Sequence, residues 1–191
     1  MKVTSSILAG ALLAVTSTSV FAAEMNAGTI HFTGLIIEPS CTILGDSGTD
    51  STIPLGTYPT SLFAKTGDES PLVPFSITLA DCPVQSDGLP AVQLTFNGTT
   101  DLTKSTSLLD VSKLTTEGDA AATGVGIAIS PDGKDNQLLT FDGAEEQIYI
   151  ALSTKSTNTI KQDFNARYRS FAAAVTAGPA DADLTVNILY R

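Results

Sequence analysis

Three carboxylic acids that stand close together in the sequence, Asp142, Glu145 and Glu146, are of a type that could do acid–base chemistry. Glycosidic bonds, for example, are hydrolysed by a pair of such acids. The surrounding segment, Phe-Asp-Gly-Ala-Glu-Glu, is instead typical of a solvated turn between strands. Because nothing in the sequence places these acids in a cleft, we predict no catalytic residue and expect that the protein is not an enzyme.

Residues that could bind a metal are also few. The sequence has one histidine, His31, and two cysteines, which excludes most sites built from several histidines or cysteines. In the segment Asp-Gly-Lys-Asp-Asn, residues 132–136, a lysine interrupts the ligand spacing of a calcium loop and no bidentate acid follows at the required offset. We expect neither a metal nor any other cofactor.

The N-terminal residues have the pattern of a secretory signal peptide. Lys2 is followed by the apolar run Ile7 to Val15, which is too short to span a bilayer, and Val20-Phe21-Ala22 offers small residues at the cleavage positions. We therefore predict a signal peptide over residues 1–22. No later apolar run is long enough for a membrane helix, so we expect export without direct membrane insertion.

Export determines how the cysteines are interpreted. In an oxidising compartment Cys41 and Cys82, the only two cysteines, most simply pair with each other. A disulfide across so long a loop stabilises the fold by roughly 4 kcal/mol in the chain-entropy model. A reactive thiol would need neighbouring cations or a Cys-x-x-Cys spacing, and neither cysteine has them.

The overall composition indicates a folded, acidic protein. Ten Lys and Arg residues stand against 20 Asp and Glu residues, which gives a formal net charge of −10. This charge disfavours binding to nucleic acid or to anionic membranes. Hydrophobic residues make up 42% of the 191 residues, which is enough for the core of one domain.

The hydrophobic pattern that must position these residues has a period of two. Short alternating or β-branched segments recur between turn signals and predict an all-β sandwich of immunoglobulin-like size. A short helical turn is expected at residues 61–64, and the segment Phe164 to Val175 fits either a helix or a strand. The predicted strands are Gly28 to Glu38, Leu72 to Ala80, Ala91 to Asn97, Gly124 to Ser130, Gln147 to Ser153 and Ala182 to Tyr190.

The strands at the two ends of the chain are the most informative. Ile30 and Phe32 share one strand face with Gly28 and Gly34, directly after the predicted cleavage site, where a chain end normally frays. Near the other end, alternating apolar residues continue almost to the C-terminal Arg191. These residues are Leu184, Val186, Ile188 and Tyr190.

These features together resemble the pilin subunits of the chaperone–usher pathway, the type 1-like fimbrial family. Three segments resemble the family in order and spacing: Gly28 to Gly34 ahead of Cys41, Ile77-Thr78-Leu79 ahead of Cys82, and Phe164 to Tyr168. The C-terminal match is the most specific. This family has a glycine fourteenth from the end and a penultimate tyrosine, which here are Gly178 and Tyr190.

The resemblance implies an immunoglobulin-like sandwich that lacks its last strand and is completed by a donor strand from another chain. Residues 23–34 would be the N-terminal donor-strand extension and residues 35–191 the pilin domain. Donor contacts would come from Gly28, Ile30, Phe32 and Gly34, whose glycines would fit a shallow part of the neighbour's groove. A periplasmic chaperone would fill the groove first, an outer-membrane usher would follow, and identical or related pilins would then polymerise.

The resemblance also assigns the C-terminal residues. The strand beside the groove, which the chaperone would recognise, is expected to include Gly178, Leu184, Val186, Ile188, Tyr190 and the terminal carboxylate of Arg191. The same strand must also pack against the core. The ambiguous segment becomes a strand by resemblance, which makes Phe164, Ala166 and Tyr168 core residues.

The expected function is that of a structural fimbrial subunit that is exported through the periplasm and mediates adhesion as part of the fibre. A minor adaptor or terminator subunit is an alternative in the same family. From another class, the alternative is a secreted β-sandwich binding protein that is complete by itself and folds without a chaperone.

Overall fold

The structure, a computed structural model, describes residues 29–38, 40–155 and 159–190. The predicted signal peptide, Gly28 and Arg191 lie outside the described residues. The chain divides after Ile36 into two units.

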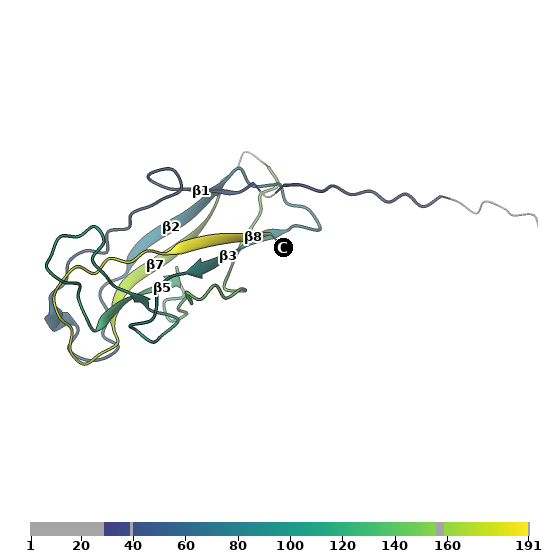
Figure 1. Cartoon of the computed structure of the whole chain (residues 1–191). Coiled ribbons are helices and arrows are strands. Elements are labelled where there is room, and N and C mark those ends of the chain that lie inside the picture. The colour runs from purple at the N-terminus through teal and green to yellow at the C-terminus, as the bar shows by residue number, and fades with distance from the viewer. Residues whose placement is uncertain (1–28, 39, 156–158, 191) are drawn as a thin grey trace, which may run out of the picture. The chain divides into compact units, whose positions relative to one another are not determined.

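One layer of the second unit is a five-stranded antiparallel sheet (Figure 1). Its strands lie in the order β1, β2, β7, β5 and β4. Their bounds are Thr42–Leu44 for β1, Val73–Ala80 for β2, Ile160–Ser170 for β7, Val125–Pro131 for β5 and Leu109–Asp110 for β4.

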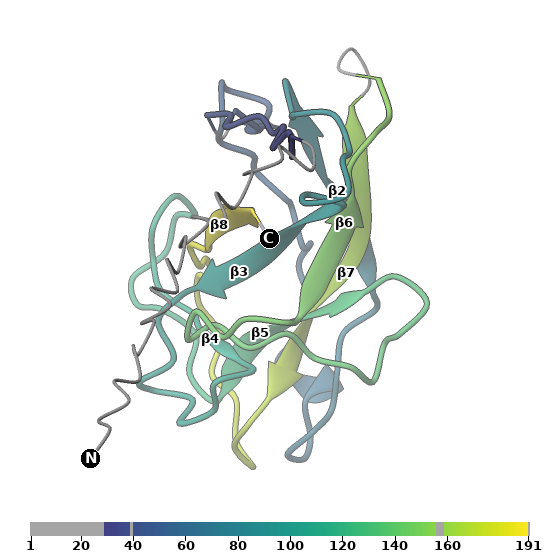
Figure 2. The same ribbon diagram turned by 90° about the vertical axis from the view of Figure 1, so that its right-hand side faces the viewer.

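The other layer is a three-stranded antiparallel sheet in the order β6, β3 and β8. Its strands are β6 (Ile148–Ala151), β3 (Ala91–Asn97) and β8 (Thr185–Tyr190). Strands β3 and β8 lie side by side in both ribbon views (Figures 1 and 2). The predicted helical turn is present as the 3-10 turn η1 (Thr60–Leu62), and no helix in the described residues could cross a membrane.

The core lies between the two sheets and is built by period-two alternation. Val92, Leu94 and Phe96 of β3 are fully buried, as are Leu79 and Phe164 of the opposite sheet. The Phe164 ring stacks on Phe75 at 5.4 Å and meets Phe96 edge-to-face at 6.0 Å. The predicted all-β sandwich is therefore confirmed.

Strand β7 resolves the ambiguous segment in favour of a strand. Its inner face carries Phe164 and Ala166, which are buried, and Tyr168, which is half-buried. On the outer face, Arg167 is only 3% exposed. Its guanidinium donates to the Ser130 hydroxyl at 3.0 Å, and its Nε forms an ion pair with Glu69 at 2.9 Å without hydrogen-bond geometry. This side of β7 is therefore a covered polar layer.

Two sequence predictions differ from the structure. The strand predicted over Gly28 to Glu38 is not formed, since no strand is assigned in the described part of that range. Strands β1 and β4, with three and two residues, were not predicted. A strand needs a neighbour to hydrogen-bond with, and alternation alone cannot supply one.

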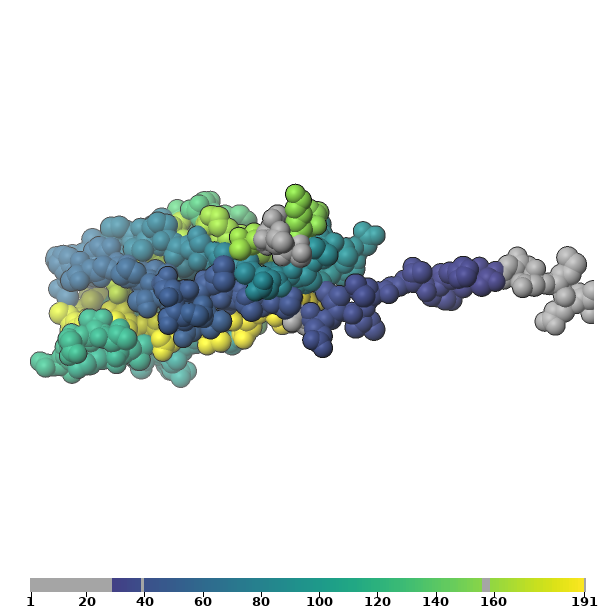
Figure 3. Space-filling view, turned by 90° about the horizontal axis from the view of Figure 1, so that it is seen from above, coloured from purple at the N-terminus to yellow at the C-terminus, as the bar shows by residue number. Residues whose placement is uncertain are grey.

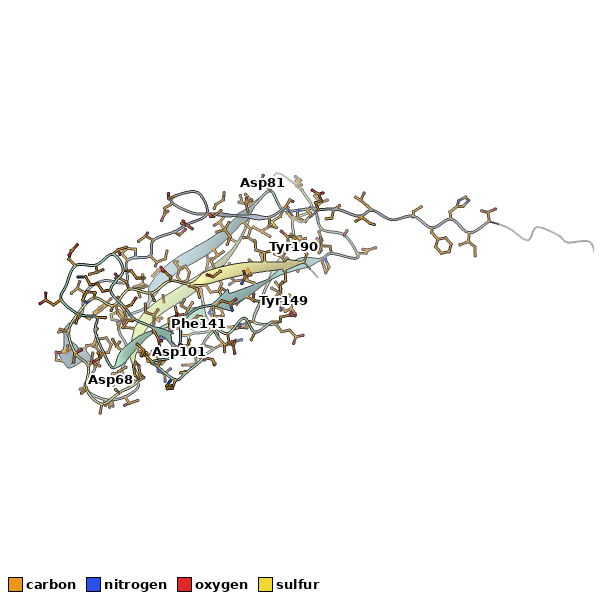
Figure 4. All side chains as sticks on the ribbon, viewed as in Figure 1. Asp68, Asp81, Asp101, Phe141, Tyr149 and Tyr190 are labelled. Carbon is orange, nitrogen blue, oxygen red and sulfur yellow. A yellow bond between two sulfur atoms is a disulfide. The ribbon has the colours of Figure 1, made fainter. Side chains whose placement is uncertain are left out.

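The sandwich has two distinct ends. Cys41, Cys82 and Tyr190 lie at one, the disulfide end, whereas β7 ends and β8 begins at the opposite one, the far end. In Figure 4, Asp81 and Tyr190 mark the disulfide end, and Asp68 and Asp101 lie toward the far end.

Candidate functional site

The N-terminal segment, residues 29–36, displays large apolar side chains that are mostly exposed. Ile30 is 80% exposed, Phe32 92% and Ile36 99%. A Cβ added at Gly34 would meet no atom within 4 Å, so the segment's own surroundings do not require that glycine. So many neighbouring exposed apolar residues make this segment a candidate interaction site.

The side chains on the inner face of β8 are less buried than those of the neighbouring strand β3. Phe96, Leu94 and Val92 of β3 pair directly with Val186, Ile188 and Tyr190 of β8, so both sets point into the same core layer. The β3 residues are fully buried, but their β8 partners and Leu184 are only half-buried. The difference arises at the outer side of β8, where the described residues provide no further strand.

The open edge of β8 faces the edge strand of the other sheet. Ile43 of β1 and, further along the chain, Leu55 and Tyr58 pack against the core and are half-buried like the β8 residues. In the space-filling view the C-terminal strand, in yellow, runs along the border of the blue segment that includes β1 (Figure 3). Half-buried apolar residues from β8 on one side, and from β1 and the segment after it on the other, thus flank the same open edge.

Tyr190 joins the two edges at the disulfide end. The Cys41 backbone N–H donates a hydrogen bond to the Tyr190 hydroxyl at 2.8 Å, and Cys41 is disulfide-bonded to Cys82. Since Cys82 follows β2, this cluster ties β8 to both β1 and β2. Tyr190 therefore has a structural role in the isolated chain besides any role in recognition.

Asp181 anchors the segment that leads into β8 at the far end. Its carboxylate accepts hydrogen bonds from the backbone N–H groups of Leu114, Thr115 and Thr116 at 3.1, 2.8 and 2.7 Å. The Thr116 hydroxyl donates a further bond at 2.6 Å, and Ser112 and Asp181 pair through their backbones. One carboxylate thereby holds the loop of residues 112–116 against the start of β8.

Two further contacts fix the same segment. The Tyr168 hydroxyl donates to the Ala180 carbonyl at 3.1 Å, so this core residue also orients the approach to β8. Gly178 lies before β8 rather than on it, and a Cβ there would meet the Ala120 carbonyl oxygen at 2.2 Å. Close backbone packing in its own chain is thus sufficient reason for a glycine at this position.

The Asp181 contacts predict a pH-dependent contribution to stability. Hydrogen bonds from the Thr116 hydroxyl, and then from the backbone N–H groups, lower the pKa of Asp181. A lowered pKa means that the stabilisation is complete above the unfolded pKa of about 3.9 and is lost as pH falls through the lower folded pKa. We expect Asp181→Asn to reduce the free energy of unfolding at pH 7 by about 1–2 kcal/mol, a value kept low for solvent screening.

Urea denaturation of the purified chain at pH 7 and at pH 3 checks this prediction. The gap between Asp181→Asn and the unsubstituted chain should be smaller at pH 3. Asp183→Asn, two residues away, removes the same charge without touching the loop of residues 112–116 and is the matched control. Equal losses for the two substitutions would contradict the role assigned to Asp181.

One of the three acids that could have suggested catalysis has a structural role. Asp142 accepts hydrogen bonds from the Thr140 hydroxyl at 3.0 Å and the Ala144 N–H at 3.2 Å, and these lower its pKa. In the segment that was compared with a calcium loop, Asp132 and Asp135 accept hydrogen bonds from the Asn165 side-chain amide. Across the parts of the chain that the structure describes, no group of three or more His, Cys, Asp or Glu residues could hold a metal ion.

The sequence predictions for this site have mixed outcomes. The structure brings Cys41, Tyr190 and the β8 face together, and it leaves Ile30 and Phe32 exposed on a segment without secondary structure. Asp181 was missed, because its partners lie more than 60 residues away in the sequence. No local pattern could have identified it.

Comparison with known proteins agrees with these features. The family model described as fimbrial protein matches residues 30–191. The type-1 fimbrial protein A chain of Salmonella typhi is 39% identical over 184 residues, with 96% of this chain and 92% of that protein covered. The probable major fimbrial subunit LpfA of Escherichia coli O157:H7 is 35% identical, with 94% and 92% covered.

A solved structure agrees at the level of the fold. The crystal structure of the P pilus rod subunit PapA is 25% identical and superposes with a TM-score of 0.59. The match covers 80% of this chain and 99% of that chain.

Proposed function

Because the chain belongs to the fimbrial protein family, we propose that it polymerises by lending its N-terminal segment to the open edge of β8 in another copy. As a member of that family it is a structural subunit of a surface fimbria, and it is exported to the cell surface. Its fold is an immunoglobulin-like sandwich that lacks its last strand. Residues 23–34 would supply the missing strand.

One observation carries the proposal. Within a single core layer, the β3 side chains are fully buried whereas their directly paired β8 neighbours are half-buried. A sandwich complete in itself would cover both rows. The complementary apolar surface, Ile30 and Phe32, lies exposed on the N-terminal segment of the same chain, so two copies together hold both halves of the interaction.

The physical gain from strand addition is large. In an immunoglobulin-like sandwich, the strand beside β8 runs antiparallel to it. The twelve residues 23–34, at about 3.4 Å each, would span roughly 41 Å. Burial of Ile30 and Phe32 would contribute about 1.5–3 kcal/mol each, and main-chain hydrogen bonds to the free edge of β8 would add to this.

Before polymerisation, we propose, a periplasmic chaperone covers the same edge and an outer-membrane usher receives the complex. A half-buried apolar face such as that of β8 would otherwise promote aggregation. In this proposal the apolar residues of β8, with Tyr190, contact the chaperone strand, and the terminal carboxylate of Arg191 meets basic chaperone residues. The protein acts by assembly, without chemical turnover.

Tyr190 provides a test of chaperone capture. Tyr190→Ala removes both the aromatic surface and the hydroxyl that joins Cys41, so periplasmic abundance and chaperone co-purification are expected to fall several-fold. Tyr190→Phe keeps the ring and should retain most of the capture. Immunoblotting of periplasmic extracts and of chaperone pull-downs measures both, and unchanged levels for Tyr190→Ala would count against the proposal.

Polymerisation itself is tested on a denaturing gel. Material sheared from the cell surface is run unheated and after boiling in acid, and is probed for this chain. We expect a ladder of multimers that collapses to one monomer band, because a fully paired strand unfolds very slowly. A monomer in both lanes would argue instead for a terminator, a weakly assembled minor subunit or a self-complete secreted domain.

A further inference from the structure

A pocket of about 330 Å³ opens at the far end of the sandwich. It lies beyond the last residue pair of β5 and β7, Val125 and Ser170. Phe171 and Ala174, which follow β7, line one side, and Val111 lies deeper. Leu102, which is 69% exposed, also lines the pocket.

The pocket is preformed and its polar groups are already engaged. The Asp110 carboxylate accepts the backbone N–H groups of Leu102 and Thr103 at 2.8 and 2.9 Å. Gly124 has φ +76°, and a Cβ there would meet the Ala174 carbonyl oxygen at 2.3 Å. The glycine therefore allows residues 124 and 174 of the pocket wall to pack closely against each other. What the pocket offers to a ligand is therefore apolar surface, suited to aliphatic side chains.

Strand direction determines what reaches the far end in a polymer. A donor strand antiparallel to β8 has its C-terminal end at the start of β8, which is the far end. Only residues 35–40 separate the proposed donor strand from Cys41, and six residues span at most about 20 Å. The disulfide end of the donating copy must therefore lie next to the far end of the accepting copy.

Two apolar residues lie within this short connection. Leu35 is 86% exposed and Ile36 99% exposed in their own chain. We propose that the far-end pocket of one copy receives Leu35 and Ile36 of the next copy, an interaction that rests on the proposed strand exchange. It would fix the orientation of successive subunits, which a donor strand followed by a free linker would leave variable.

Cysteine cross-linking in assembled fibres tests this contact. Leu35→Cys or Ile36→Cys is combined with Leu102→Cys or Ala174→Cys, and the fibres are oxidised. At least one pair should give multimers that survive boiling in acid and collapse with reductant, since a disulfide needs Cα atoms about 4.4–6.8 Å apart. Single-cysteine variants, and Leu35→Cys with Tyr149→Cys on the sheet surface, should give none.

The outcomes separate this inference from the proposed function. If all four pairs fail while the acid-sensitive ladder persists, the pocket contact is wrong and strand exchange stands. If the unsubstituted chain forms no ladder, both are overturned. As a second measurement, Leu35→Ser with Ile36→Ser should leave the ladder intact but speed dissociation about tenfold or more; an unchanged rate would also overturn the contact.

Discussion

A chain that lacks residues 23–34 is expected to fold and yet to form no multimers by itself. The buried core and the half-buried residues around it lie at or beyond Cys41, so the deletion removes none of the packing that holds the sheets together. It removes Ile30 and Phe32, the side chains proposed to complete another copy. Because the acceptor edge remains, such a chain should still receive a donor strand.

The deleted chain is therefore expected to end the growth of fibres formed by the unmodified chain, besides forming none by itself. Expressed with the unmodified chain, the deleted chain should occupy one end of each fibre and shorten the ladder in proportion to its amount. His31→Ser and Phe32→Ser form a matched pair within the segment. Only Phe32→Ser, which changes the apolar face, should reduce multimers. Normal fibres from the deleted chain alone would refute strand donation by this segment.

The predictions from sequence succeeded where the signal is local. Strands β2, β3, β5 and β8 follow alternating apolar positions, because each has one face on the core. The alternation of Ile30 and Phe32 was also real, but the strand it predicted lacks a neighbouring strand in its own chain. In the proposed function this mismatch has a physical reason, since the neighbour would belong to another molecule.

Features that depend on distant segments could not be predicted from the sequence. Arg167 alternates with core residues in the sequence and is therefore expected to point outward. The sequence does not show that Glu69 and the loop with the Asp135 carbonyl cover its side chain there. Strand β1 is three residues long and has no period to detect. The glycine at 178 was assigned to the groove edge by resemblance, whereas its structural requirement comes from residues 120–122.

The acceptor edge gives the second prediction with a large effect. Ile188 is half-buried opposite the fully buried Leu94, and strand addition would bury it further. Ile188→Asp would place an unpaired carboxylate in that layer, which costs several kcal/mol. We expect loss of strand acceptance by about three orders of magnitude, and hence no multimers from this chain alone.

Mixing variants distinguishes lost acceptance from lost folding. The Ile188→Asp chain keeps residues 23–34 and should still donate, whereas the chain without these residues should only accept. Together they are expected to give a two-copy species and nothing longer.

Asn187→Asp adds the same charge one residue away on the exposed face of β8 and should polymerise normally. Ile188→Ala should slow assembly without adding a charge. Multimers from Ile188→Asp alone would show that polymerisation does not use the edge of β8, and equal loss with Asn187→Asp would trace the effect to charge rather than to the covered face.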